Sequence, residues 1–198
     1  MPENYTDIIY FLEHFEKVSQ ESGYAFVYDV MALMQKLIPC DEINITIAKS
    51  YSNHSADVKP GTKPMWIASE FMSETEDLFY TTLEYIPYVK WAATTMMDNL
   101  INGDTCQPLT CRDYHVNNEE DIGWFYKRVG VKDVMSTAGL LDRNQFIKAK
   151  QTEGYYNIFI VMVRSKNSNY FHAKEKALFD VMFRVFLSRF REKINGIM

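Results

Sequence analysis

The sequence predicts an α+β fold in which helices flank a mostly antiparallel central sheet. Three observations lead to this class: two amphipathic helical patterns open the chain, four stretches have the composition of strands, and a long helical pattern closes it. The chain has 198 residues, of which 47% are hydrophobic and 24% charged, so its composition is that of an ordinary globular protein. We therefore expect residues 1–198 to form a single domain.

Helices are predicted at 6–19 and 27–38. In both segments apolar residues recur at steps of three and four, which is the pattern of a helix with one buried face. Gly23 separates the two patterns. Pro39 ends the second one, because proline has no amide hydrogen and restricts the residue before it.

The first two strands are predicted as a hairpin. Three isoleucines alternate with Asn, Thr and Ala over residues 43–48, as in a strand with one face in the core. Residues 51–63 are rich in Ser, Asn, Asp, Gly and Pro, and residues 65–68 can return as a short strand. The connecting loop is therefore long.

Two helices are predicted after the hairpin, at 73–85 and 119–129, with an irregular connection between them. Ser73 and Glu76 have the spacing of a capping box at the start of the first. Gly130 is suited to the end of the second.

The last three elements are two strands and a long helix. Residues 134–141 and 156–164 have strand composition, and the continuous apolar run 158–163 predicts a central strand. Residues 172–193 are helical in pattern. All four strands are expected in one sheet.

Charge and cysteine content narrow the class of protein. Nucleic-acid-binding modules carry an excess of positive charge, whereas the net charge of this chain is −5. We therefore expect no direct contact with DNA or RNA. No apolar run is long enough to span a membrane, and the acidic N-terminal segment is unlike a signal peptide. Three cysteines are too few for a disulfide framework. These features predict a cytoplasmic protein that does not bind a membrane.

Catalytic and metal-binding patterns are weak. Cys106, Cys111 and His115, with His54, could be imagined as a zinc or haem-iron site or a nucleophile with its base, but their spacing is loose and suits ordinary loop residues better. The eight glycines form no phosphate loop, and no nucleophile elbow or metalloprotease motif is present. We expect no enzyme, no metal and no cofactor.

Two stretches carry a resemblance to a known family. Residues 123–134, Gly-Trp-Phe-Tyr-Lys-Arg-Val-Gly-Val-Lys-Asp-Val, place an aromatic segment before a glycine turn and a strand. The strand 157–164 is followed by a polar turn and by the helix start 171–179, Phe-His-Ala-Lys-Glu-Lys-Ala-Leu-Phe. Both are similar to the GAF-like, autoinducer-binding-like sensor domains of LuxR-family transcriptional regulators, over most of residues 78–190.

The resemblance implies a GAF/PAS-like sandwich that senses a small molecule and takes part in signal transduction and transcription regulation. These regulators carry a C-terminal helix-turn-helix. The sequence has none before Met198, so either that half was removed or the protein is a stand-alone relative that acts through a partner. The aromatic and acidic set of acyl-homoserine-lactone sensors does not align convincingly here, so that ligand is not predicted.

An apolar or aromatic ligand is the expected partner. The family's pocket is lined by a strand and a helix, and aromatic residues concentrate in the matching part of this chain. The residues expected to bind the ligand are Trp66, Phe79, Leu83, Tyr88 and Trp91. The same side chains could instead be plain core packing in an interaction module without a ligand.

A homodimer is also expected, through the last helix. Leu178, Met182 and Val185 already supply one core-facing stripe, and a second stripe exceeds what one face needs. Packing within the chain is the competing explanation. The residues assigned to the dimer interface are Phe179, Phe183, Phe186 and Phe190.

Overall fold

A computed structural model of the protein describes eight segments of the chain. They are residues 3–21, 23–50, 62–69, 95–96, 98–113, 130–148, 155–165 and 167–194. For residues 62–69 only the backbone is described. The predicted helices 73–85 and 119–129 lie outside the described residues.

The described elements that the sequence predicted follow one another in the predicted order. They are α1 (Glu3–Val18), α2 (Gly23–Leu37), β1 (Glu42–Ser50), β2 (Thr62–Ser69), β3 (Leu109–Thr110), β4 (Val131–Leu140), α6 (Arg143–Lys148), β5 (Tyr155–Ser165) and α7 (Ala173–Ile194). Residues 95–96 and 98–102 are also helical.

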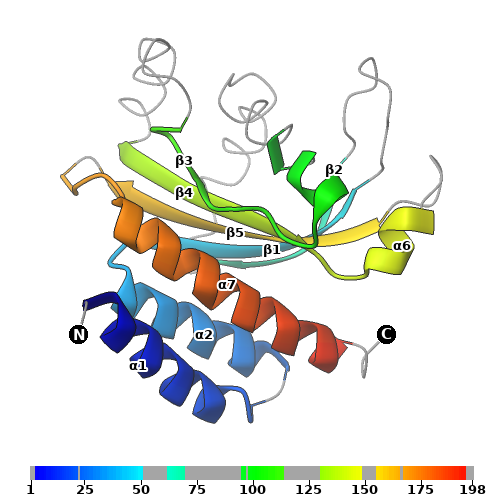
Figure 1. The fold of residues 1–198 in the computed structure, drawn as a ribbon, viewed down its shortest axis with the longest axis horizontal. Coiled ribbons are helices and arrows are strands. Elements are labelled where there is room, and N and C mark those ends of the chain that lie inside the picture. The colour runs from blue at the N-terminus through cyan, green and yellow to red at the C-terminus, as the bar shows by residue number, and fades with distance from the viewer. Residues whose placement is uncertain are drawn as a thin grey trace.

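The strands form one antiparallel sheet in the order β2-β1-β5-β4-β3. The β1–β2 hairpin is confirmed, and so is the central place of β5, which pairs with β1 on one side and β4 on the other. Figure 1 shows α1, α2 and α7 together on one side of the sheet. The predicted α+β class, with helices flanking a mostly antiparallel sheet, is confirmed.

Three short elements were not predicted. The connection expected to be irregular contains the helical residues 95–96 and 98–102 and the two residues of β3. The other missed element is α6, which has only six residues and therefore shows no helical period in the sequence. The Asp142 carboxylate starts it by accepting the amides of Asn144 (2.7 Å) and Gln145 (3.2 Å).

The main core lies between the sheet and the helices α1, α2 and α7. From the sheet come the alternate side chains of β1 and β5, such as Ile43, Ile45 and Ile160, none more than 1% exposed. β4 and α7 come closest at Gly139, where a Cβ would stand 2.5 Å from Leu187 Cδ2. Only glycine permits this approach.

The structure corrects the place of the four phenylalanines assigned to a dimer interface. Phe179, Phe183 and Phe186 are fully buried in the core of one chain, and Phe190 is 6% exposed. The reason is that α7 has neighbours on two sides: it packs on the sheet near Gly139, and the Phe186 ring stacks at 5.8 Å on a phenylalanine of α2. Both apolar stripes are therefore used within the chain, and these side chains leave no surface for a second subunit.

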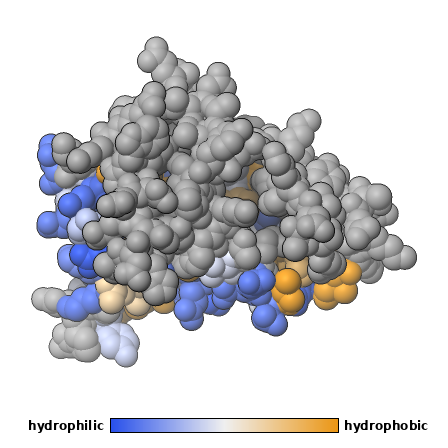
Figure 2. Space-filling model, turned by 90° about the horizontal axis from the view of Figure 1, so that it is seen from above, coloured by the Kyte–Doolittle hydropathy of each residue, from blue (hydrophilic) through white to orange (hydrophobic). Residues whose placement is uncertain are grey.

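Apolar surface in the described part is scattered. In the view from above (Figure 2), hydrophilic and hydrophobic areas of the described residues both appear at the margins of the molecule, and the hydrophobic ones lie at separate places. The exposed large hydrophobic residues of the described part are Tyr5, Ile9 and Leu12 on α1, Tyr28 on α2, and Ile101 and Ile147. Within the described ranges, no helix is both long and apolar enough to cross a membrane.

Candidate functional site

The side of the sheet away from α1, α2 and α7 is the candidate site. Along β5, Ile158, Ile160 and Met162 are buried against the helices, while the alternate residues Phe159 and Val161 are only half-buried. β5 is a central strand, so this exposure does not come from a free sheet edge. Apolar side chains in the middle of a sheet that stay partly accessible are suited to contact an additional group.

Polar side chains stand in the same rows as these apolar ones. The register sets Val161 between Asn44 of β1 and Ser136 of β4, and it sets Phe159 next to Thr46. Residues directly opposite in antiparallel strands share a face. We call Asn44, Thr46, Ser136, Phe159 and Val161 the second face.

Asn44 presents an unused acceptor on the second face. Its Oδ1 atom is buried and has no hydrogen-bond partner. A buried carbonyl oxygen without a donor costs free energy, so a ligand donor that reaches it gains more than a donor placed in water. The hydroxyls of Thr46 and Ser136 can each donate or accept.

Seven buried hydrophobic side chains of the described residues lie outside the main core, and we call them the second core. Its members are Met96, Leu100, Cys106, Leu109, Ala138, Leu140 and Tyr155. Figure 1 shows the helical residues 95–96 and 98–102, in green, across the sheet from α7. The sheet is therefore covered from both sides at this end.

The segment 103–110 is held to β4 by main-chain hydrogen bonds. The Cys106 amide donates to the carbonyl of Ala138 (2.8 Å), and the Leu140 amide donates to the carbonyl of Asp104 (2.9 Å). The Thr137 hydroxyl donates to the Cys106 carbonyl (2.8 Å). These contacts fix the wall of the second face to the sheet.

Cys106 is a structural thiol. Its Sγ donates to the Met96 carbonyl at 3.1 Å, and burial raises the pKa of the thiol to about 12. A thiol that stays protonated is a poor nucleophile. Within the described residues, no group of three His, Cys, Asp or Glu side chains could hold a metal ion. His54 and His115 lie outside the described residues.

The far end of the sheet is tied to the start of α7 by charged groups with structural roles. Arg164 pairs with Glu175 at 2.6 Å, and the Glu175 carboxylate also accepts the amide of His172 (2.8 Å). Buried Asp133 accepts the amides of Phe171 (2.8 Å) and Val134 (3.0 Å), and its burial raises the pKa of the carboxyl. Glu175 and Asp133 thus both hold main-chain amides at the start of α7, those of His172 and Phe171.

The five residues predicted to bind ligand are not described together. Phe79, Leu83, Tyr88 and Trp91 lie outside the described residues, so their role stays a prediction. Trp66 lies in β2, and the register sets it opposite Ile47, which packs against the main core.

The second face was missed by the sequence interpretation. One signal for it was the alternation of apolar and polar residues over 43–48. The polar positions were assigned to the face away from the core, and no function was assigned to them. The apolar run 158–163 was the other signal, since a strand that is apolar on both faces has a covered surface on each side.

Comparisons with known proteins identify the fold. No family model and no curated protein matches the chain. Among solved structures, the LuxR-family transcription factor CepR2 of Burkholderia cenocepacia, described as N-acylhomoserine-lactone dependent, superposes with a TM-score of 0.55 over 96% of this chain and 98% of its own. The VqsR LBD domain of Pseudomonas aeruginosa superposes with a TM-score of 0.51 over 98% of each chain.

The chain shares its fold with CepR2 and with the VqsR LBD domain. Escherichia coli SdiA shares it with a TM-score of 0.56, over 96% of this chain and 69% of the other. Sequence identities are 11%, 14% and 11% with CepR2, VqsR and SdiA, so the likeness is one of fold. The resemblance to domains of LuxR-family regulators is confirmed at the level of the fold.

Proposed function

We propose that the chain is a small-molecule-sensing regulatory domain of a LuxR-type transcriptional regulator. Its ligand binds on the second face and controls the conformation or the dimerisation of the protein. One observation carries the proposal: half-buried Phe159 and Val161 stand in the middle of the sheet, in the same rows as polar Asn44, Thr46 and Ser136. The LuxR-type fold supports it, since CepR2 is described as dependent on a small molecule.

The second face suits a neutral ligand that is mostly apolar or aromatic. Phe159 and Val161 supply apolar contact, and the polar side chains of the face are amides and hydroxyls without charge. The buried Asn44 Oδ1 accepts, so the ligand presents at least one N–H or O–H donor. None of the five residues of the second face is titratable, and the same row of β1 continues to Glu42, opposite Val163.

Regulation in this proposal takes place in the cytoplasm and without direct nucleic-acid contact by this chain. The acidic net charge of −5 supports the second point. A ligand regulates only if it binds one conformation or association state better than another. Self-association belongs to the proposal, on surfaces other than the four buried phenylalanines.

Binding of N-phenyl-1-naphthylamine tests the proposal. This probe is neutral and aromatic, carries one N–H donor, and fluoresces more strongly in apolar surroundings. We expect saturable binding that Val161→Trp abolishes by filling the face. Asn44→Leu should weaken it roughly tenfold, as expected when a buried donor loses its acceptor.

Val181→Trp on α7 is the matched control, because Val181 is half-buried on the helix and lies away from the second face. It should leave binding unchanged. Binding that is equal in the wild type and Val161→Trp would rule out this site.

A further inference from the structure

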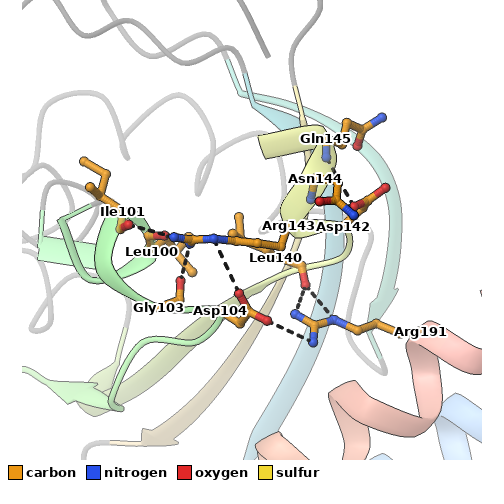
Figure 3. Close-up of polar contacts among 10 residues, drawn as sticks. All are labelled: Leu100, Ile101, Gly103, Asp104, Leu140, Asp142, Arg143, Asn144, Gln145 and Arg191. Atoms are coloured by element: carbon orange, nitrogen blue, oxygen red, sulfur yellow. Dashed lines mark hydrogen bonds and ion pairs between the residues drawn. The ribbon is translucent and has the colours of Figure 1, made fainter. Parts of the chain in front are cut away.

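Arg143 closes the end of the helical residues 95–102 (Figure 3). One guanidinium nitrogen, Nη1, donates to the carbonyls of Leu100 (2.6 Å) and Gly103 (3.0 Å), and Nη2 donates to that of Ile101 (3.0 Å). The last carbonyls of a helix have no partner within it. A side chain from the start of α6, some forty residues later in the chain, supplies the donors here.

Asp104 joins Arg143 to a second arginine. Its Oδ1 lies 3.8 Å from Arg143 Nε, and its Oδ2 lies 3.5 Å from Nη1 of Arg191, in the final turns of α7. Arg191 also donates from Nε (3.0 Å) and Nη2 (2.6 Å) to the Leu140 carbonyl. Because the Leu140 amide donates to the Asp104 carbonyl at 2.9 Å, Asp104, Arg191 and Leu140 form a closed ring, and Arg143 joins this ring through Asp104.

The ring joins two layers that the sheet otherwise separates. The helical residues 95–102 lie on the side of the second face, where Met96 and Leu100 are buried, whereas α7 lies on the other side (Figure 1). Arg143 also stands 5.4 Å over the Phe146 ring, which packs edge-on at 4.8 Å against Tyr155 of the second core. A shift on the second-face side therefore reaches Arg143 by two routes. One route is the carbonyls of residues 100, 101 and 103, and the other is the rings of Tyr155 and Phe146.

The side chains of the ring are well placed to move. Those of Arg143, Asp104 and Arg191 are 33%, 45% and 28% exposed. Ion pairs with this exposure are weak, so single contacts can break and re-form without unfolding. The two guanidinium groups act more through the directions of their hydrogen bonds than through their charge, since five of the contacts are hydrogen bonds to main-chain carbonyls.

We propose that Arg143, Asp104 and Arg191 form a clasp that couples the helical residues 95–102 to the end of α7. A movement on one side of the sheet changes the order of the other side. Only the trigger rests on the proposed function: a ligand on the second face sets the position of residues 95–102, and the clasp passes it to the C-terminal turns.

Hydrogen–deuterium exchange without any ligand tests the coupling in the full chain. Arg143→Gln should raise exchange in residues 95–103, which Arg143 caps, and also in the α7 residues 188–194, which it does not touch. We expect an increase of roughly threefold or more in α7, the low end for residues coupled in one network. Arg191→Gln should conversely raise exchange in residues 95–103, since coupling is reciprocal.

Two controls separate coupling from general loosening. Arg189→Gln removes the same charge from the end of α7, but Arg189 pairs with Glu192 (2.6 Å) within the helix and should not affect residues 95–103. Exchange in α1 should be unchanged in every variant. If Arg143→Gln does not fold, Arg143→Lys replaces it in the experiment, because lysine keeps the charge and lacks the branched guanidinium donors. The same rise of exchange in α7 is expected.

Exchange that rises only beside each replaced side chain would overturn the clasp, because both arginines would then be local caps. The result does not depend on the binding of N-phenyl-1-naphthylamine, so the clasp and the proposed function fail separately. If the clasp holds, adding the probe should lower exchange in residues 188–194 of the wild type and not of Arg143→Gln.

Discussion

Replacing Gly139 by alanine should destabilise the protein, because β4 and α7 meet there without room for a side chain. An added Cβ would stand 2.5 Å from Leu187 Cδ2 and 3.0 Å from Phe183 Cζ. Leu187 is 1% exposed and Phe183 is fully buried, so neither side chain can swing into solvent. The methyl group has to displace packed core.

The magnitude follows from two opposing effects. Overpacking a full core by one methyl group costs about 1–3 kcal/mol. Alanine also restricts the unfolded chain, which stabilises the folded state by about 0.4–1 kcal/mol. We therefore expect a net loss of roughly 1–2 kcal/mol in the free energy of unfolding for Gly139→Ala.

Gly103→Ala is the matched control. A Cβ at Gly103 would meet its nearest atoms at 3.7 and 3.8 Å, which is ordinary contact, so only the gain of about 0.4–1 kcal/mol remains. Urea unfolding should show a lower midpoint for Gly139→Ala and a slightly higher one for Gly103→Ala, with equal slopes.

A compensating change sharpens the test. Leu187→Ala alone should cost about 2–5 kcal/mol through the cavity it leaves. In the Gly139→Ala background it makes room for the new methyl group, so the double variant should be more stable than the sum predicts by roughly 1 kcal/mol. Additive costs, or a Gly139→Ala protein as stable as Gly103→Ala, would refute the packing argument.

Three further predictions concern reactivity, pH and assembly. The Cys106 thiol, with its pKa raised to about 12 by burial, should react with a disulfide reagent at pH 8 far more slowly than half-buried Cys111, measured by mass spectrometry of the labelled peptides. Burial raises the pKa of Asp133, so its contribution to stability is fully present below the unfolded value of about 3.9 and is lost as pH rises through the folded value. The urea midpoint should therefore fall more between pH 4 and pH 7 in the wild type than in Asp133→Asn. Equal falls in the two proteins would contradict this. Sedimentation at micromolar concentration should show a dimer that Ile9→Glu, on the exposed face of α1, shifts towards monomer, whereas Phe183→Glu should lose its fold; a wild-type monomer would exclude self-association.

The helices α1, α2 and α7 and the central strand β5 could be predicted from the sequence because their signals are local. Hydrophobic period is set by the geometry of each element, and Pro39 acts on its own neighbours. The fold class followed from the order of these elements. The short elements β3 and α6 could not be predicted, since two and six residues are too few to show a period.

The candidate site depended on tertiary structure. Asn44 and Thr46 were visible as the polar positions of an alternating strand, but only the register of β1 with β5 sets them beside Val161 and Phe159. The same local pattern is compatible with several pairings. A polar residue on a strand therefore acquires a role only when its neighbours across the sheet are known.

The same reason explains the error at α7 and the absence of the clasp from the sequence interpretation. Two apolar stripes predicted that α7 has two partners, which is correct, but the pattern does not say whether the second partner is another subunit or, as found, α2. Arg143 caps carbonyls some forty residues earlier in the chain, and Arg191 is linked to this region by its ion pair with Asp104. Periodicity determines which face of an element is buried, whereas the partner of that face is decided only when distant parts of the chain come together.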